Sequence, residues 1–102
     1  MNTVEQFIEQ RAIKRGNISL FSKEDAISFI ETCRKHSIRL LGIDSFILHP
    51  EEKIQPSMAD SVDYSSLYYS VKTGDLYTDA VEFLQDRNDR LFFEVIFDDK
   101  NK

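Results

Sequence analysis

The sequence predicts an α+β fold, in which a small, largely antiparallel sheet carries helices on one face in a single two-layer domain. Two apolar segments of strand character, residues 38–48 and 91–97, each follow a segment with helical periodicity. The apolar fraction is 41%, with eight Phe and four Tyr, which indicates an ordered domain rather than a disordered chain. A length of 102 residues suits one core, so we expect residues 1–102 to form a single domain.

The first predicted element is an N-terminal helix within residues 1–16. Thr3 can act as its N-cap, with Gln6 three positions later as the reciprocal partner. Gly16 and Asn17 are expected to end it.

The second predicted helix spans residues 23–36 and has the strongest helical pattern in the chain. Ser22 precedes two acids in the first turn, where the helix dipole favours negative charge. Apolar residues then recur at helical spacing, at Ala26, Phe29, Ile30 and Cys33. Cys33 is the only cysteine, so it cannot form an internal disulfide, and we interpret it as a small buried hydrophobic residue.

Residues 38–48 are too apolar for an edge strand and are predicted to form the central strand. A turn at residues 49–53 leads to a short return strand at residues 54–55, which Pro56 is expected to end. Residues 57–74 lack a clean period and are interpreted as a long surface loop, a kind of segment that is often functional.

A third helix is expected from residue 75 to about residue 87, followed by a strand at residues 91–97 and a frayed tail at residues 98–102. In that strand Phe93 and Val95 share one face and Glu94 lies on the other. The inward positions of these helices and strands should be buried; they are Phe29, Ile30, Ile43, Phe46, Ala80, Leu84, Phe93 and Val95.

Acidic residues are concentrated in the second half of the chain. Residues 1–48 carry seven Lys/Arg and six Asp/Glu, whereas residues 49–102 carry six Lys/Arg and twelve Asp/Glu. Negative charge on one part of a small domain repels nucleic acid and anionic lipid and attracts basic proteins. We therefore expect a basic protein partner, with no nucleic acid and no membrane as partners; the oligomeric state stays open.

No metal site or cofactor is expected, because the chain offers two separated histidines, one cysteine and no metal-binding spacing. The N-terminus lacks the basic and apolar regions of a signal peptide, and no apolar run is long enough for a membrane span. The expected location is the cytoplasm.

Asp44 lies inside the predicted central strand, where a carboxylate is costly without a partner. Asp44 with Asp63, or Asp44 with Glu94, could form an acid and base pair of a small enzyme. The competing interpretation is that Asp44 faces solvent or bonds a loop backbone. No nucleophile or phosphate-loop motif supports catalysis, so we expect no enzyme.

The aromatic and acidic residues of the predicted loop and of the next helix are the candidate partner-binding site. Tyrosines are enriched at interface hot spots, and carboxylates near them would speed association with a basic protein. A loop that is merely solvated, with tyrosines covering the edge of the core, is the alternative. The candidate residues are Asp60, Asp63, Tyr64, Tyr68, Tyr69, Asp75 and Asp79.

The chain contains the short segments Gly42-Ile43-Asp44-Ser45-Phe46, Ile54-Gln55-Pro56, Asp63-Tyr64-Ser65, Ala80-Val81-Glu82-Phe83-Leu84 and Leu91-Phe92-Phe93-Glu94. Together they resemble small bacterial immunity proteins of polymorphic toxin systems, the family catalogued as Immunity protein 40. The resemblance covers about residues 22–97. It implies an inhibitor that binds one cognate toxin and has no reaction of its own, and it supplies no contact residues.

The expected function is that of a cytoplasmic protein-binding domain, an immunity or antitoxin-like inhibitor that occludes a basic toxin with its acidic C-terminal half. The alternative is a small enzyme or ligand-binding domain that uses Asp44 with Asp63 or Glu94. A structural or regulatory subunit without a dedicated site is a third possibility.

Overall fold

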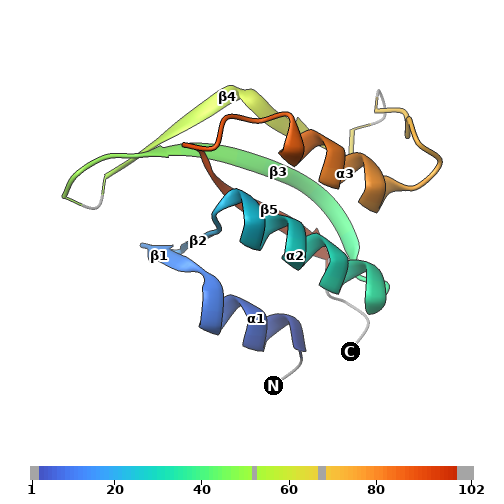
Figure 1. Ribbon diagram of the computed structural model, residues 1–102, viewed down its shortest axis with the longest axis horizontal. Helices are drawn as coiled ribbons and strands as arrows, with labels where there is room; N and C mark the ends of the chain where they lie inside the picture. The colour runs from blue at the N-terminus through green and yellow to red at the C-terminus, as the bar shows by residue number, and fades with distance from the viewer. Residues whose placement is uncertain (1–2, 52, 67–68, 99–102) are drawn as a thin grey trace.

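A computed structural model describes residues 3–51, 53–66 and 69–98 of the chain. Its helices are α1 (Thr3–Arg11), α2 (Lys23–Lys35) and α3 (Leu76–Gln85). Its strands are β1 (Ile13–Arg15), β2 (Ile18–Leu20), β3 (Arg39–Leu48), β4 (Ile54–Asp63) and β5 (Phe92–Asp98). Figure 1 shows these elements in one compact arrangement.

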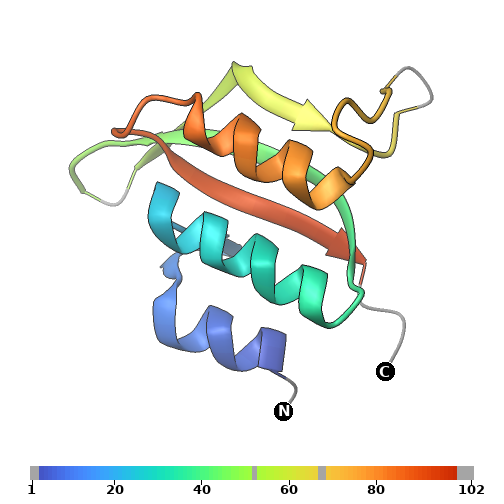
Figure 2. The same cartoon turned by 45° about the vertical axis from the view of Figure 1, so that its right-hand side comes forward.

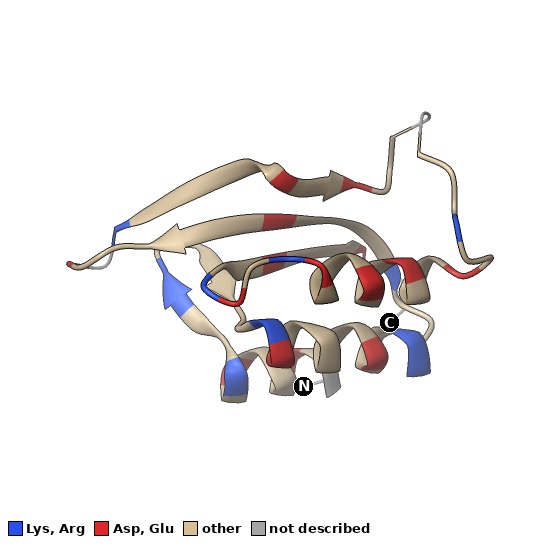
Figure 3. Ribbon diagram, turned by 45° about the horizontal axis from the view of Figure 1, so that its top comes forward, with Lys and Arg blue, Asp and Glu red and all other residues tan. Residues whose placement is uncertain are grey.

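The larger sheet has three antiparallel strands in the order β4-β3-β5. The helices lie on the same side of this sheet (Figure 3), which gives two layers. The α+β fold with helices on one face is therefore confirmed. The two strands predicted with most apolar character, β3 and β5, are direct neighbours, and β3 is central as predicted.

The core lies between the sheet and the helices. All eight side chains that the periodicity predicts to be inside are buried, which confirms that prediction. Phe21 stacks on Phe29 of α2, with ring centroids 5.0 Å apart, and Phe29 meets Phe97 of β5 edge to face. Phe46 is buried outside the main core cluster, in register with Phe92 on β5.

The predicted second helix is α2, with Ser22 as its N-cap and His36 as its C-cap. The Ser22 hydroxyl accepts a hydrogen bond from the backbone N–H of Asp25 at 3.3 Å. This bond satisfies one of the N–H groups that a helix leaves unpaired at its start.

The prediction of a single helix through residue 16 is wrong, because α1 ends at Arg11. Residues 13–20 form the β1–β2 hairpin instead, with Arg15 opposite Ile18. Gly16 has a φ of +60° in its turn, a conformation that glycine adopts without steric cost. The sequence signal was a Gly-Asn pair between two short segments with isoleucine, which is typical of a hairpin.

The hairpin is joined to the large sheet through Phe21. Its backbone N–H donates to the carbonyl of Phe93, and the N–H of Phe93 donates to the carbonyl of Phe21, both at 2.8 Å. This antiparallel bridge covers part of the outer edge of β5.

The prediction that Pro56 ends a two-residue strand is also wrong. β4 runs from Ile54 to Asp63, so residues 57–63 belong to the sheet rather than to a loop. Pro56 is tolerated because β4 is an edge strand, where a missing N–H breaks no ladder on the open side. The strand carries small and polar residues, and its Met58 is 79% exposed, so it lacks the apolar alternation of a strand that faces a core on one side.

At Gly42 of β3 the backbone of β4 approaches closely. A Cβ atom at this position would lie 2.8 Å from the carbonyl oxygen of Val62, which is too close for any other residue. The register between β3 and β4 shifts just beyond it, between Ile43 and Ser45.

Candidate functional site

The α3–β4 pocket is a cavity of about 260 Å³ between helix α3, the end of β4 and the segment that connects them. Figure 2 shows α3 lying along β4, with this connecting segment at the N-terminal end of the helix. The pocket is lined by Ser61, Val62, Tyr64, Tyr69, Lys72, Asp79, Glu82, Phe83, Asp86 and Arg87. Three of the predicted partner-binding residues, Tyr64, Tyr69 and Asp79, therefore meet in one place.

A neighbouring cavity of about 370 Å³ is lined by Ile47, Ser57, Asp60, Asn88, Arg90 and Leu91. It is connected to the pocket through side-chain contacts of β4. Asp60 accepts a hydrogen bond from Ser57 at 2.7 Å and lies 3.8 Å from the guanidinium of Arg87. Asp60 thus stands between the two cavities, half-exposed.

Asp79 lies on the inner side of α3 and is only 6% exposed. Its carboxylate accepts hydrogen bonds from the Tyr69 hydroxyl at 2.6 Å and from the backbone N–H of Lys72 at 2.8 Å. The backbone N–H and the hydroxyl of Thr73 donate to it at 2.9 and 2.6 Å. Asp79 therefore fixes the segment before α3.

The protonation of Asp79 follows from these contacts. Burial disfavours its charged form, but the hydrogen bonds from Thr73, Tyr69 and Lys72 outweigh burial and hold the pKa of Asp79 well below its ordinary value. The hydrogen bond has the opposite effect on its donor: burial together with the bond to Asp79 raises the pKa of Tyr69 to about 12. Asp79 is an anion and Tyr69 a neutral phenol at physiological pH.

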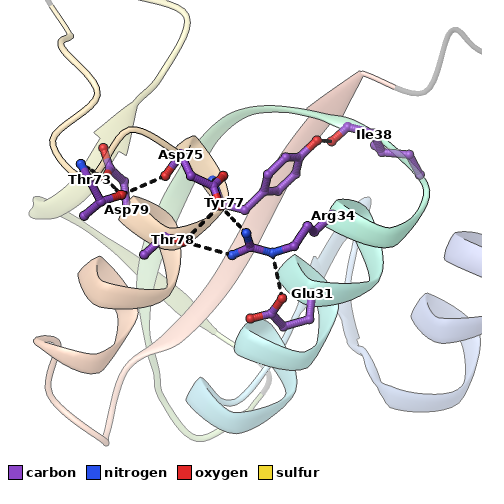
Figure 4. Close-up of polar contacts among 8 residues, drawn as sticks. All are labelled: Glu31, Arg34, Ile38, Thr73, Asp75, Tyr77, Thr78 and Asp79. Carbon is purple, nitrogen blue, oxygen red and sulfur yellow. Dashed lines mark hydrogen bonds and ion pairs between the residues drawn. The ribbon is translucent and has the colours of Figure 1, made fainter.

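Asp75 is the N-cap of α3 and points away from the pocket, toward α2. Its carboxylate accepts from the backbone N–H of Tyr77 and from the Thr78 hydroxyl, both at 3.0 Å, and it pairs with Arg34 of α2. Figure 4 shows this group, in which Arg34 also bonds Glu31. Burial opposes ionisation here too, yet these partners lower the pKa of Asp75. Asp75 therefore ties two helices together.

Tyr64 is 9% exposed and belongs to the core cluster. Its ring packs edge to face against Tyr69, with centroids 4.9 Å apart. Its hydroxyl is buried and has no hydrogen-bond partner among the described residues. Burial, with the nearby Tyr69 and Asp79, raises the pKa of Tyr64, so the phenol is neutral.

The other predicted residues lie at the edge of this site or outside it. Asp63 is exposed at the end of β4 and accepts hydrogen bonds from the backbone N–H and hydroxyl of Ser65, at 2.9 and 2.6 Å. These bonds lower its pKa. Tyr68 lies outside the described residues.

Two pocket residues, Phe83 and Arg87, were missed by the sequence reasoning. The guanidinium carbon of Arg87 lies 4.3 Å from the centre of the Phe83 ring, within the range of a cation–π contact. A signal for this pair was available, because residues four apart share one side of a helix. The acidic residues Glu82 and Asp86 flank the pair and are exposed.

Asp44 and Glu94, the carboxylates of the alternative enzymatic site, lie directly opposite each other on β3 and β5. Burial and the charge of Asp44 raise the pKa of Glu94. Asp63 is the register partner of Gly42, two residues before Asp44. Neither cavity described above is lined by any of these three carboxylates.

Comparisons with known proteins leave the family open: no protein-family model, no curated protein and no solved structure matches the chain. Within residues 3–51, 53–66 and 69–98, no helix has the length and apolar character needed to cross a membrane. In the same residues, no three His, Cys, Asp or Glu side chains gather as metal ligands would.

Proposed function

We propose that this chain is a protein-binding domain of the cytoplasm, an immunity or antitoxin-like inhibitor that occludes a basic toxin partner with its acidic C-terminal half. The observation that carries the proposal is the α3–β4 pocket, where aromatic rings are bordered by the exposed carboxylates Glu82 and Asp86. Aromatic anchors bordered by charge are a common composition for the centre and rim of a protein interface.

The acidic residues of this region are of two kinds. Asp75 and Asp79, both predicted interface residues, are engaged in internal hydrogen bonds, so they stabilise the fold rather than offer contacts. Asp60 was predicted as well, whereas Glu82 and Asp86 were not; all three are at least partly accessible, and these carboxylates are the ones that a basic surface would meet. Exposed charges of this kind act mainly on the rate of encounter.

The proposal is tested with the C-terminal domain of the polypeptide encoded immediately upstream. We expect a stoichiometric complex in calorimetry, loss of toxicity on co-expression, and association that slows as salt rises. Reversing Glu82 and Asp86 to Lys should slow association about tenfold at low salt.

The matched control reverses Glu9 and Glu24, two exposed acids of α1 and α2 that do not line the pocket. This pair changes the net charge by the same amount. If both double variants slow association to the same extent, the effect is one of net charge and the pocket is not the interface. If the neighbouring polypeptide neither binds nor is neutralised, the inhibitor proposal is wrong.

The enzymatic alternative rests on Asp44 and Glu94, which lie opposite each other on adjacent strands. The pKa of Glu94 is raised. A raised pKa suits a general acid. Turnover of a phosphoester, glycoside or peptide substrate by the purified protein, lost in Asp44→Asn, would favour this function over inhibition.

A further inference from the structure

Arg87 holds an unusual place in the α3–β4 pocket. It follows the C-cap of α3, and its side chain, 22% exposed, turns back over the ring of Phe83. Its nearest carboxylate is Asp60 on β4, at 3.8 Å. That separation permits Coulomb attraction but exceeds the distance of a hydrogen bond.

The guanidinium is poorly satisfied where it lies. Its Nε atom is buried and has no hydrogen-bond partner among the described residues, and the same is true of the Tyr64 hydroxyl in the same pocket. Buried polar atoms are hydrogen-bonded in the great majority of cases, and an unpaired one costs free energy. Arg87 is therefore held weakly, by its ring contact and by one long ion pair.

The surroundings of Arg87 suit a cationic side chain in general. Phe83 offers an aromatic face, and Asp60, Glu82 and Asp86 supply negative charge on two sides. Tyr64 contributes a buried hydroxyl that can accept a hydrogen bond. A ring face with nearby carboxylates is an arrangement that binds guanidinium groups, through cation–π attraction and charge.

We infer that Phe83, Asp60 and Tyr64 form a subsite for a cationic side chain, which Arg87 occupies in the free chain and which an arginine or lysine of a basic protein partner takes over. The identity of that partner rests on the function proposed above, whereas the subsite can be tested without it. Charge complementarity selects this occupant, because the rim acids repel an acidic side chain.

We expect the exchange to proceed by rotation of the Arg87 side chain. Its backbone carbonyl accepts a hydrogen bond from the ammonium of Lys23, which also donates to the carbonyl of Gln85 at 3.3 Å. These bonds do not depend on the Arg87 side chain, so the end of α3 stays in place when the guanidinium leaves. Arg87 and a cationic side chain of the partner thus compete for the subsite.

The test measures binding of a small cationic probe, N-acetyl-arginine amide, by NMR titration. Removing the internal occupant in Arg87→Ala should tighten probe binding about tenfold relative to the unchanged chain, which corresponds to the strength of one modest cation–π contact. Adding Asp60→Asn to Arg87→Ala should reverse most of this gain. The neutral probe N-acetyl-glutamine amide should bind neither variant measurably.

Arg39→Ala is the matched control, because Arg39 is an exposed arginine of β3 that lines neither cavity. It removes the same charge away from the subsite and should leave probe affinity within about twofold of the unchanged chain. Thermal unfolding checks that each variant folds. If Arg87→Ala does not fold, Arg87→Gln, which keeps part of the aliphatic stem, replaces it.

Equal probe affinity in the unchanged chain and in the Arg87 variants would overturn the inference, as would an equal gain in Arg39→Ala. The two proposals fail separately. If the probe binds as expected but the neighbouring polypeptide does not, the subsite stands and the toxin partner is wrong. If that polypeptide binds the Arg87 and Asp60 variants with unchanged affinity, the interface lies elsewhere.

Discussion

The two ends of helix α3 use the same kind of residue for different purposes. At the N-terminal end, Asp75 and Asp79 accept hydrogen bonds from side chains and backbone groups, and each joins segments of the fold. At the C-terminal end, Glu82 and Asp86 are exposed beside an arginine whose Nε has no partner in the described part of the chain. Figure 3 shows acidic positions, in red, along α3.

This difference shows that the acidic residues of the second half of the chain do not form one binding surface. Carboxylates whose hydrogen-bonding capacity is filled stabilise the fold and offer little to a partner, whereas exposed carboxylates near unpaired polar atoms cost little to remove and are available for binding. The net charge of the chain counts both kinds of carboxylate and does not distinguish them. The following predictions separate them, from the largest expected effect to the smallest.

Asp79→Asn should destabilise the protein by about 3 kcal/mol, because an amide places N–H donors where Tyr69, Lys72 and Thr73 already donate. Asp86→Asn removes the same charge at the other end of the helix and should change the free energy of unfolding by less than about 0.5 kcal/mol. Urea unfolding at pH 7 measures both. An equal loss of stability in Asp79→Asn and Asp86→Asn would contradict the difference between the two ends of α3.

The cost of Asp79→Asn should depend on pH. The pKa of Asp79 in the folded chain lies below its ordinary value of 3.8, so the stability that its carboxylate contributes is complete above about pH 4. That contribution is lost as the pH falls through the folded pKa. The free energies of unfolding of the unchanged chain and of Asp79→Asn should therefore approach each other as the pH falls from 4 to 2. A constant difference over this range would contradict the hydrogen-bonded carboxylate.

The two tyrosines of the pocket give a matched pair. Tyr69→Phe should cost about 1–2 kcal/mol, because it removes a hydrogen bond to a carboxylate. Tyr64→Phe should cost nothing or stabilise the protein slightly, because it removes a buried hydroxyl that has no partner among the described residues. Thermal unfolding distinguishes the two, and a clear loss in Tyr64→Phe would show that its hydroxyl is satisfied in solution.

A smaller effect is expected at the carboxylate pair on the sheet. Glu94→Gln should stabilise the protein by about 0.5 kcal/mol at pH 7, since like charges directly opposite each other on adjacent strands are destabilising. The pKa of Glu94 is raised by burial and by Asp44, so the penalty exists while Glu94 is ionised and disappears as the pH falls below its ordinary 4.5. A gain that persists at pH 3 would point to packing instead.

The parts of the fold that were predictable are those in which one residue pattern decides the structure. The apolar spacing of α2 and α3 and the apolar character of β3 and β5 identify these elements and their buried faces. β4 was not predictable in this way, because its partner is β3 on one side only and its small polar residues satisfy no burial pattern. Its pairing with β3 across the turn at residues 49–53 is made by backbone groups, which leave no mark in a sequence.

The same limit applies to the site. Asp79 and Glu82 are both acids on α3, and nothing in their spacing says that one is buried. What separates them is the backbone N–H of Lys72 and Thr73, groups that every residue except proline carries and that leave no mark in a sequence. The pairing of Phe83 with Arg87 was within reach, because it is local to one helix turn.

The bridge between Phe21 and Phe93 also sets the order in which the protein can mature on the ribosome. In the part of the chain that the structure describes, the N-terminal hairpin reaches the sheet through β5, which follows all the other strands in chain order, so the hairpin has no edge to join while the intervening elements are being synthesised. Closure over so long a loop is entropically costly and slow to find. A nascent chain that stops before β5 therefore leaves the hairpin detached and the outer edge of β3 unpaired.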